Sequence, residues 1–150
     1  MSPQVIGVDE QDTEPVDVDR WAALAAASLA DQGVTSTTAE LNLLFVDESE
    51  MAELNEQHMG HSGPTDVLSF PLELPEPLGA DQPALLGDIV VCPAVARHNA
   101  PTHAGTYDDE LALLVVHGVL HILGHDHAEP DEEATMQGIE RELLSRYHHR

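Results

Sequence analysis

Three histidines in the C-terminal half of the chain have the spacing of metal ligands. His117 and His121 are four residues apart, so on an α-helix both imidazoles point from one face toward one ion. Gly124 can take the left-handed conformation that ends a helix, which would bring His127 back toward the same ion. Three imidazoles with a fourth position open to water describe a catalytic zinc site, with zinc-bound water as the assumed nucleophile.

The spacing H-x-x-x-H-x-x-G-x-x-H is that of the metzincin peptidases, except that Gly118 replaces their catalytic glutamate. That glutamate takes a proton from the zinc-bound water, so peptide hydrolysis by this mechanism is disfavoured. What remains is a metal hydrolase with an unidentified proton carrier. His125 and Asp126 lie between the ligands, where they either orient a ligand or fill the turn. The other histidines are interpreted as surface or terminal residues: His58, His61, His98, His103, His148 and His149.

The histidines must be positioned by a helix expected from Thr106 to Gly124. Acidic residues in the first turn favour this helix, and the apolar run Leu111–Val116 predicts that the helix is buried. Further helices are expected over 16–32, 49–59, 93–102 and 131–147, strands over 4–9, 40–46, 65–70 and 85–91, and a proline-punctuated loop over 75–83. This mixture predicts an α+β fold, a single domain over residues 1–150 in which helices pack on a small mixed sheet.

The composition is strongly acidic. A net charge of −23 arises from 28 acidic residues against five arginines and no lysine. This balance repels phosphate and disfavours nonspecific binding to nucleic acid, although it is also explained as a surface adaptation for solubility or salt. Cys92 alone cannot form an intrachain disulfide, no signal peptide is visible, and no apolar stretch reaches the ~18 residues of a membrane span. A soluble cytoplasmic protein is expected.

Three segments of the chain resemble those of the YbeY family of bacterial endoribonucleases and rRNA maturation factors. Residues His117–His127 resemble the signature H-G-x-L-H-L-x-G-Y-D-H, Pro64–Pro71 resemble P-T-D-V-L-S-F-P, and Leu86–Val91 resemble L-G-D-I-x-I. The segments follow the family's order, and the resemblance covers the chain from about Glu40 to Leu144.

The resemblance implies a zincin-like fold, one zinc ion per chain bound by His117, His121 and His127, and metal-dependent cleavage of single-stranded RNA. The implied role is maturation of the 3′ end of 16S rRNA and ribosome quality control, with the small ribosomal subunit or its associated proteins as partners. The other two segments either border the cleft or form ordinary sheet core. Their polar residues of interest are Thr65, Asp66, Ser69 and Asp88.

Two residues depart from the family pattern. Met59 stands where many members carry an arginine, which removes a phosphate contact or transition-state clamp, and His125 replaces a tyrosine and adds a titratable group beside the metal. Recruitment of RNA by a ribosomal protein would bypass the acidic surface. Two alternatives stay open: a metallopeptidase or other metal hydrolase, disfavoured by Gly118, and a non-catalytic ribosome-assembly factor with a structural metal.

Overall fold

The structure is a computed structural model that describes residues 3–72, 84–125 and 128–148. Its elements in chain order are β1 (Gln4–Asp9), α1 (Val18–Asp31), β2 (Ala39–Phe45), α2 (Glu48–Met59), β3 (Val67–Pro71), β4 (Ala84–Val91), α3 (Pro93–Asn99), a 3-10 turn (Ala100–Thr102), α4 (Tyr107–Ile122) and α5 (Pro130–Tyr147). Each predicted helix and strand is present within a few residues of its predicted ends. The expected loop over 75–83 lies outside the described residues.

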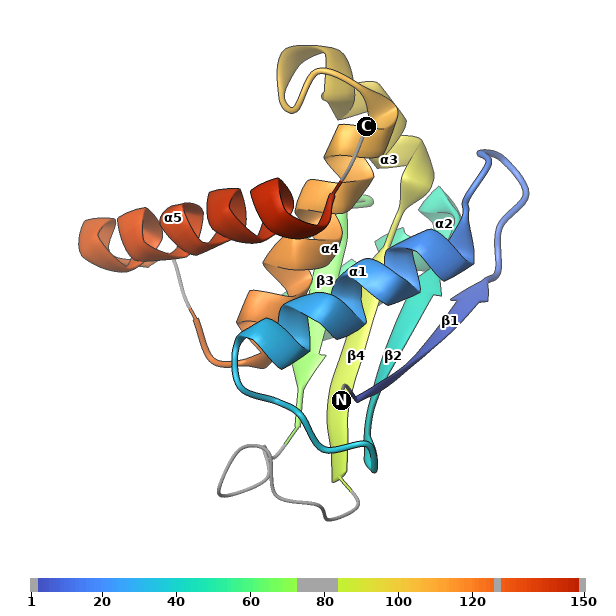
Figure 1. Cartoon of the computed structure of the whole chain (residues 1–150). Coiled ribbons are helices and arrows are strands. Elements are labelled where there is room, and N and C mark those ends of the chain that lie inside the picture. Colours follow the sequence, from blue (N-terminus) through green and yellow to red (C-terminus); the bar gives the residue numbers. More distant parts are fainter. Residues whose placement is uncertain (1–2, 73–83, 126–127, 149–150) are drawn as a thin grey trace.

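The strands form one four-stranded sheet in the order β1-β2-β4-β3. Strands β1, β2 and β4 are parallel, and β3 is an antiparallel edge strand. Helices α1 and α4 cover one face and α5 crosses over α4 (Figure 1). Leu41 and Leu43 face that core, whereas Leu68 and Val90 pack with Met51 of α2 on the opposite face. The predicted α+β class with a small mixed sheet is confirmed.

Side-chain caps fix where the helices begin. Asp17 accepts a hydrogen bond from an amide in the first turn of α1, and Thr106 does the same for α4 at 3.1 Å. Helix α2 begins one residue before its predicted start because Asp47 accepts the Glu50 amide at 2.8 Å. Such caps satisfy amides that have no partner within the helix. In the described part of the chain, no helix is long and apolar enough to cross a membrane.

Helix α4 is buried along most of its length, as its apolar sequence predicts. The helix packs closely against the sheet at Gly118, where an added Cβ would lie 2.7 Å from Cγ2 of Ile89 on β4. Position 118 therefore faces the sheet. His117 and His121 leave the helix on another side, and both remain half-buried.

Candidate metal centre

Two imidazoles converge on the exposed side of α4. The Nε2 atoms of His117 and His121 lie 3.0 Å apart, and the ring planes are inclined by 75°. Two nitrogens bound to one tetrahedral zinc at about 2.1 Å would stand about 3.4 Å apart. A slight opening of the pair thus accommodates a zinc ion, and the two residues fit the predicted group.

The third predicted ligand, His127, and its neighbour Asp126 lie outside the described residues. Within the described ranges, no group of three or more His, Cys, Asp or Glu side chains is arranged to hold a metal ion. Gly124 does take the left-handed conformation predicted for the end of the helix, with φ of 94°. His125 follows it, donates its amide to the Leu120 carbonyl at 3.0 Å, and borders a small pocket at the start of α5.

A buried carboxylate holds the first histidine in place. Oε1 of Glu140, on α5, lies 2.6 Å from Nδ1 of His117, and Glu140 is only 8% exposed. A carboxylate at Nδ1 favours the imidazole that carries its proton there, which leaves the Nε2 lone pair available to a metal. Glu140 is not among the residues that the sequence predicts for the site. The available signal was a charged residue at helical spacing between the buried residues Met136 and Leu143.

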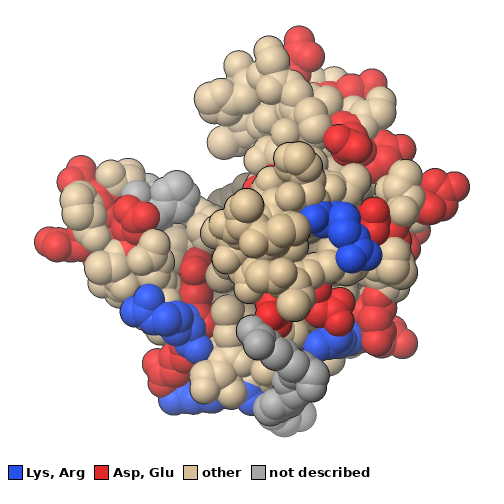
Figure 2. Space-filling model, turned by 90° about the horizontal axis from the view of Figure 1, so that it is seen from above, with Lys and Arg blue, Asp and Glu red and all other residues tan. Residues whose placement is uncertain are grey.

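His117 lies at the junction of two pockets. One, of about 290 Å³, reaches toward α5 and is bordered by Glu140 and by His103 from the loop before α4. The other, of about 470 Å³, runs along β3 and is bordered by His121 and Met59. Asp66, Val67 and His117 line both. We call the two pockets together the histidine cleft; Figure 2 shows the surface hollowed on the side of the molecule where α5 lies.

Asp66 is the predicted acidic residue that the fold brings to the histidine cleft. Its Oδ1 accepts the Val67 amide at 2.8 Å and lies 3.4 Å from the Thr65 hydroxyl, so the carboxylate is held in one orientation. Thr65 therefore helps to orient the Asp66 carboxylate. Ser69 borders the cleft, but its hydroxyl donates to the Gly118 carbonyl at 3.3 Å and ties β3 to α4.

Asp88 lies away from the histidine cleft. Side chains alternate along a strand, and its neighbour Ile89 packs against α4, so Asp88 points to the opposite face of the sheet. There its Oδ1 accepts a hydrogen bond from the Asn42 amide group on β2 at 2.9 Å. The two residues are partners on neighbouring strands, so Asp88 joins β4 to β2 through this side-chain hydrogen bond.

Positive charge is scarce around the site. Met59 is 53% exposed at the edge of the histidine cleft, and no arginine in the described ranges lines either pocket. Figure 2 shows many acidic and few basic side chains on the face it presents. Three arginines are engaged by carboxylates, in the pairs Arg20–Asp108, Arg97–Glu14 and Arg146–Asp31.

Several shifted pKa values belong to groups outside the histidine cleft. Burial raises the pKa of Tyr107 to about 12, although the Arg97 guanidinium above its ring acts in the opposite direction. Burial also raises the pKa of the Cys92 thiol. A hydrogen bond from Tyr147 lowers the pKa of Asp31. These shifts follow from local packing and ion pairing, and none depends on the histidines.

Fold and cleft define a class of protein, an α+β domain whose central buried helix presents histidines of metal-ligand type to a surface cleft. A family model described as "Endoribonuclease YbeY" matches residues 7–148. A Salinispora tropica protein named Endoribonuclease YbeY is 48% identical over 138 residues, or 87% of each chain. Its namesake from Thermobifida fusca is 44% identical, covering 93% of this chain and 92% of the relative. The chain belongs to the YbeY family of metal-dependent endoribonucleases.

A solved structure supports the same conclusion about the fold. The solution structure of TM1509 from Thermotoga maritima superposes with a TM-score of 0.58 at 26% identity. The match covers 96% of this chain and 90% of that chain. The arrangement of one small mixed sheet and its helices is therefore shared.

Proposed function

We propose that this chain is a single-domain, zinc-dependent endoribonuclease that cleaves single-stranded RNA. The ligands of the one zinc ion are His117, His121 and His127. Membership of the YbeY family supports the reaction. The observation that carries the site is the 3.0 Å approach of the His117 and His121 Nε2 atoms in a cleft, with Glu140 at the far nitrogen of His117.

The residues of the cleft have separate parts in the proposed reaction. When bound, zinc supplies a Lewis acid for a phosphodiester oxygen and lowers the pKa of water. His117 and His121 bind the ion, and Glu140 keeps Nε2 of His117 directed at it. Asp66, held through Oδ1, takes a proton at Oδ2 from the water that attacks phosphorus. In this proposal Asp66 is the proton carrier, in place of the glutamate that is absent at position 118.

The acidic surface bears on how RNA reaches the cleft. Binding to phosphates normally uses lysine and arginine, and the described arginines lie outside both pockets. We therefore propose that the small ribosomal subunit or its associated proteins present the RNA, in maturation of the 3′ end of 16S rRNA and in ribosome quality control. The reaction then takes place in the cytoplasm. The substrate strand needs to offer only one phosphodiester to the histidine cleft.

A peptidase-type base has no room at position 118. A glutamate there would begin with a Cβ 2.7 Å from Ile89 and would be directed at the sheet. The glycine therefore serves close helix–sheet packing. This favours a phosphodiester substrate over the metallopeptidase alternative.

The test is digestion of a defined RNA by the zinc-loaded protein. We expect cleavage of the single strand and much slower cleavage of the same strand in a duplex. His121→Ala should abolish cleavage, and the matched variant His98→Ala, at an exposed position on α3, should retain it. Circular dichroism checks that both variants are folded. Cleavage by folded His121→Ala would refute the catalytic site, and a wild type that binds zinc without cleaving would support the assembly-factor alternative.

A further inference from the structure

A second imidazole–carboxylate pair borders the histidine cleft. Glu110 in the first turn of α4 is fully buried, and its carboxylate lies 2.8 and 3.1 Å from Nδ1 of His103. The same carboxylate accepts the Ala104 amide at 3.1 Å. His103 is exposed, as its place in a predicted loop indicates. It is also joined to a carboxylate that is inaccessible to water.

Burying a carboxylate is costly unless it is paired and hydrogen-bonded. Glu110 meets that condition through His103, the Ala104 amide and the positive end of the α4 dipole. The pairing also fixes the orientation of the imidazole ring. The carboxylate keeps a proton on Nδ1, and Nε2 therefore points away from the carboxylate. An oriented imidazole backed by a buried carboxylate is the arrangement used to transfer protons at an exposed nitrogen.

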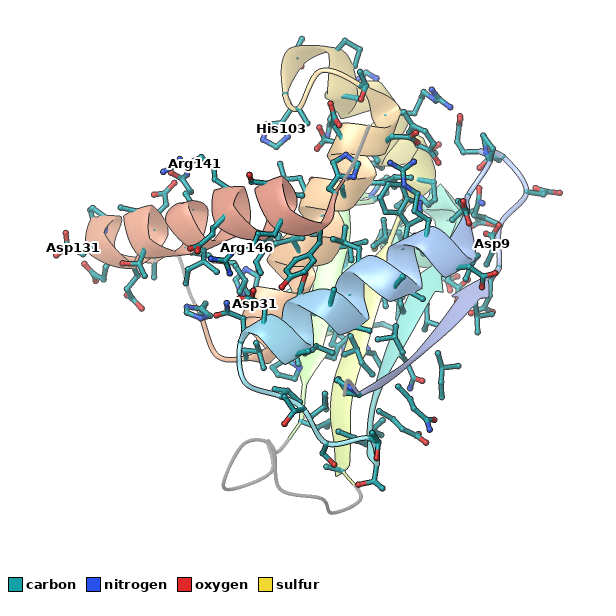
Figure 3. The ribbon with its side chains drawn as sticks, in the orientation of Figure 1. Asp9, Asp31, His103, Asp131, Arg141 and Arg146 are labelled. Carbon is teal, nitrogen blue, oxygen red and sulfur yellow. The ribbon has the colours of Figure 1, made fainter. Side chains whose placement is uncertain are left out.

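His103 is placed to use that nitrogen. Its side chain is 58% exposed and borders the pocket that His117 and Asp66 also line. Figure 3 shows it projecting from the loop before α4 toward the side on which α5 lies. The charged and titratable groups around this pocket come from three elements: Glu110 and His117 on α4, Glu133 and Glu140 on α5, and Asp66 before β3.

We propose that His103 is the general acid of the reaction. This rests on the endoribonuclease function proposed above. The oxygen of water forms a bond to phosphorus while Oδ2 of Asp66 takes its proton. The bond from phosphorus to the leaving bridging oxygen breaks, and its electron pair stays on that oxygen. The imidazolium form of His103 supplies a proton from Nε2, which leaves the neutral ring with its proton on Nδ1 beside Glu110. The products are a phosphomonoester and a hydroxyl, and exchange with solvent restores both side chains.

The experiment compares two RNA substrates that differ at one atom, the bridging oxygen that leaves. The end groups of the products show beforehand which bridging oxygen this is. In the second substrate sulfur replaces that oxygen, and a thiolate leaves without protonation. His103→Gln keeps a hydrogen-bonding group beside Glu110, and we expect it to slow cleavage of the oxygen substrate at least about 100-fold. Cleavage of the sulfur substrate should be little changed. His98→Gln, the same substitution at an exposed histidine, should affect neither.

Each outcome has one meaning. Equal loss on both substrates would show that His103 only binds phosphate or supports the loop, and it would overturn the proposal. Unchanged cleavage of the oxygen substrate would also overturn it. Failure of the wild type on both substrates would refute the endoribonuclease function itself. An independent readout is the ¹⁵N spectrum of neutral His103 in metal-free protein. We expect the proton on Nδ1 in the wild type and its shift toward Nε2 in Glu110→Ala, which removes the acceptor at Nδ1.

Discussion

Removing the carboxylate of Glu140 should weaken zinc binding without touching a ligand. The 2.6 Å contact to Nδ1 of His117 is a hydrogen bond to a charged group, and Glu140 is only 8% exposed. Such bonds contribute about 1.5–3 kcal/mol, and neutral ones about 0.5–1.5 kcal/mol. Glu140→Gln can still accept through its amide oxygen, so it should lose about 1 kcal/mol, or about fivefold in affinity. Glu140→Ala loses the whole bond and should weaken zinc binding about 10–100-fold.

The assay is competition for zinc with a chromophoric chelator at one fixed pH, which yields the Kd of each variant. The matched control is Glu142→Gln on the same helix, because Glu142 is exposed and contacts Arg146. Its Kd should equal that of the wild type. Thermal unfolding of the metal-free proteins separates loss of affinity from loss of fold. A folded Glu140→Ala that binds zinc as tightly as the wild type would refute the positioning role.

Three further predictions concern packing and charge. Gly118→Ala should lower the free energy of unfolding by about 1 kcal/mol in a denaturant titration, because overpacking costs about 1–3 kcal/mol and the gain in helix propensity is about 1 kcal/mol. Gly138→Ala, with open space around it, should be stabilising in the same titration. The Cys92 thiol, buried and with a raised pKa, should react with a thiol reagent only on unfolding. Asp31→Asn should destabilise the protein at pH 7, because the Tyr147 hydrogen bond lowers the pKa of Asp31 below its ordinary 3.8. The difference in free energy of unfolding between wild type and variant should vanish as the pH falls through that lowered pKa. A difference that stays constant with pH would contradict this prediction.

Local signals in the sequence were sufficient for the elements and for the first two histidines. The helix that begins at Thr106 has a capping side chain, acidic residues in its first turn and an apolar body, and each signal acts within a few residues. The four-residue spacing of His117 and His121 places both imidazoles together once that helix forms. These features do not depend on how the rest of the chain packs.

Long-range features were not accessible in the same way. The position of β4 between β2 and β3 decides that Asp88 pairs with Asn42 on the face opposite the histidines, and no residue near Asp88 encodes that order. The contact of Glu140 with His117 depends on the crossing of α5 over α4, and it joins residues 23 apart in the chain. His148, interpreted from the sequence as a terminal residue, makes a tilted ring contact with Trp21 and lies 2.8 Å from Asp109. These contacts likewise arise from long-range packing.

Helix α4 unites the two imidazole–carboxylate pairs of the histidine cleft. Glu110 and His117 are seven residues, or about two turns, apart and therefore lie on the same side of the helix. In one pair the helix supplies the carboxylate and a loop supplies the imidazole; in the other the helix supplies the imidazole and α5 the carboxylate. Because both pairs are built on α4, this helix sets the positions of the proposed acid and the proposed metal ligands relative to each other. In both pairs of the cleft a buried carboxylate orients an imidazole, and this arrangement requires no arginine or lysine there.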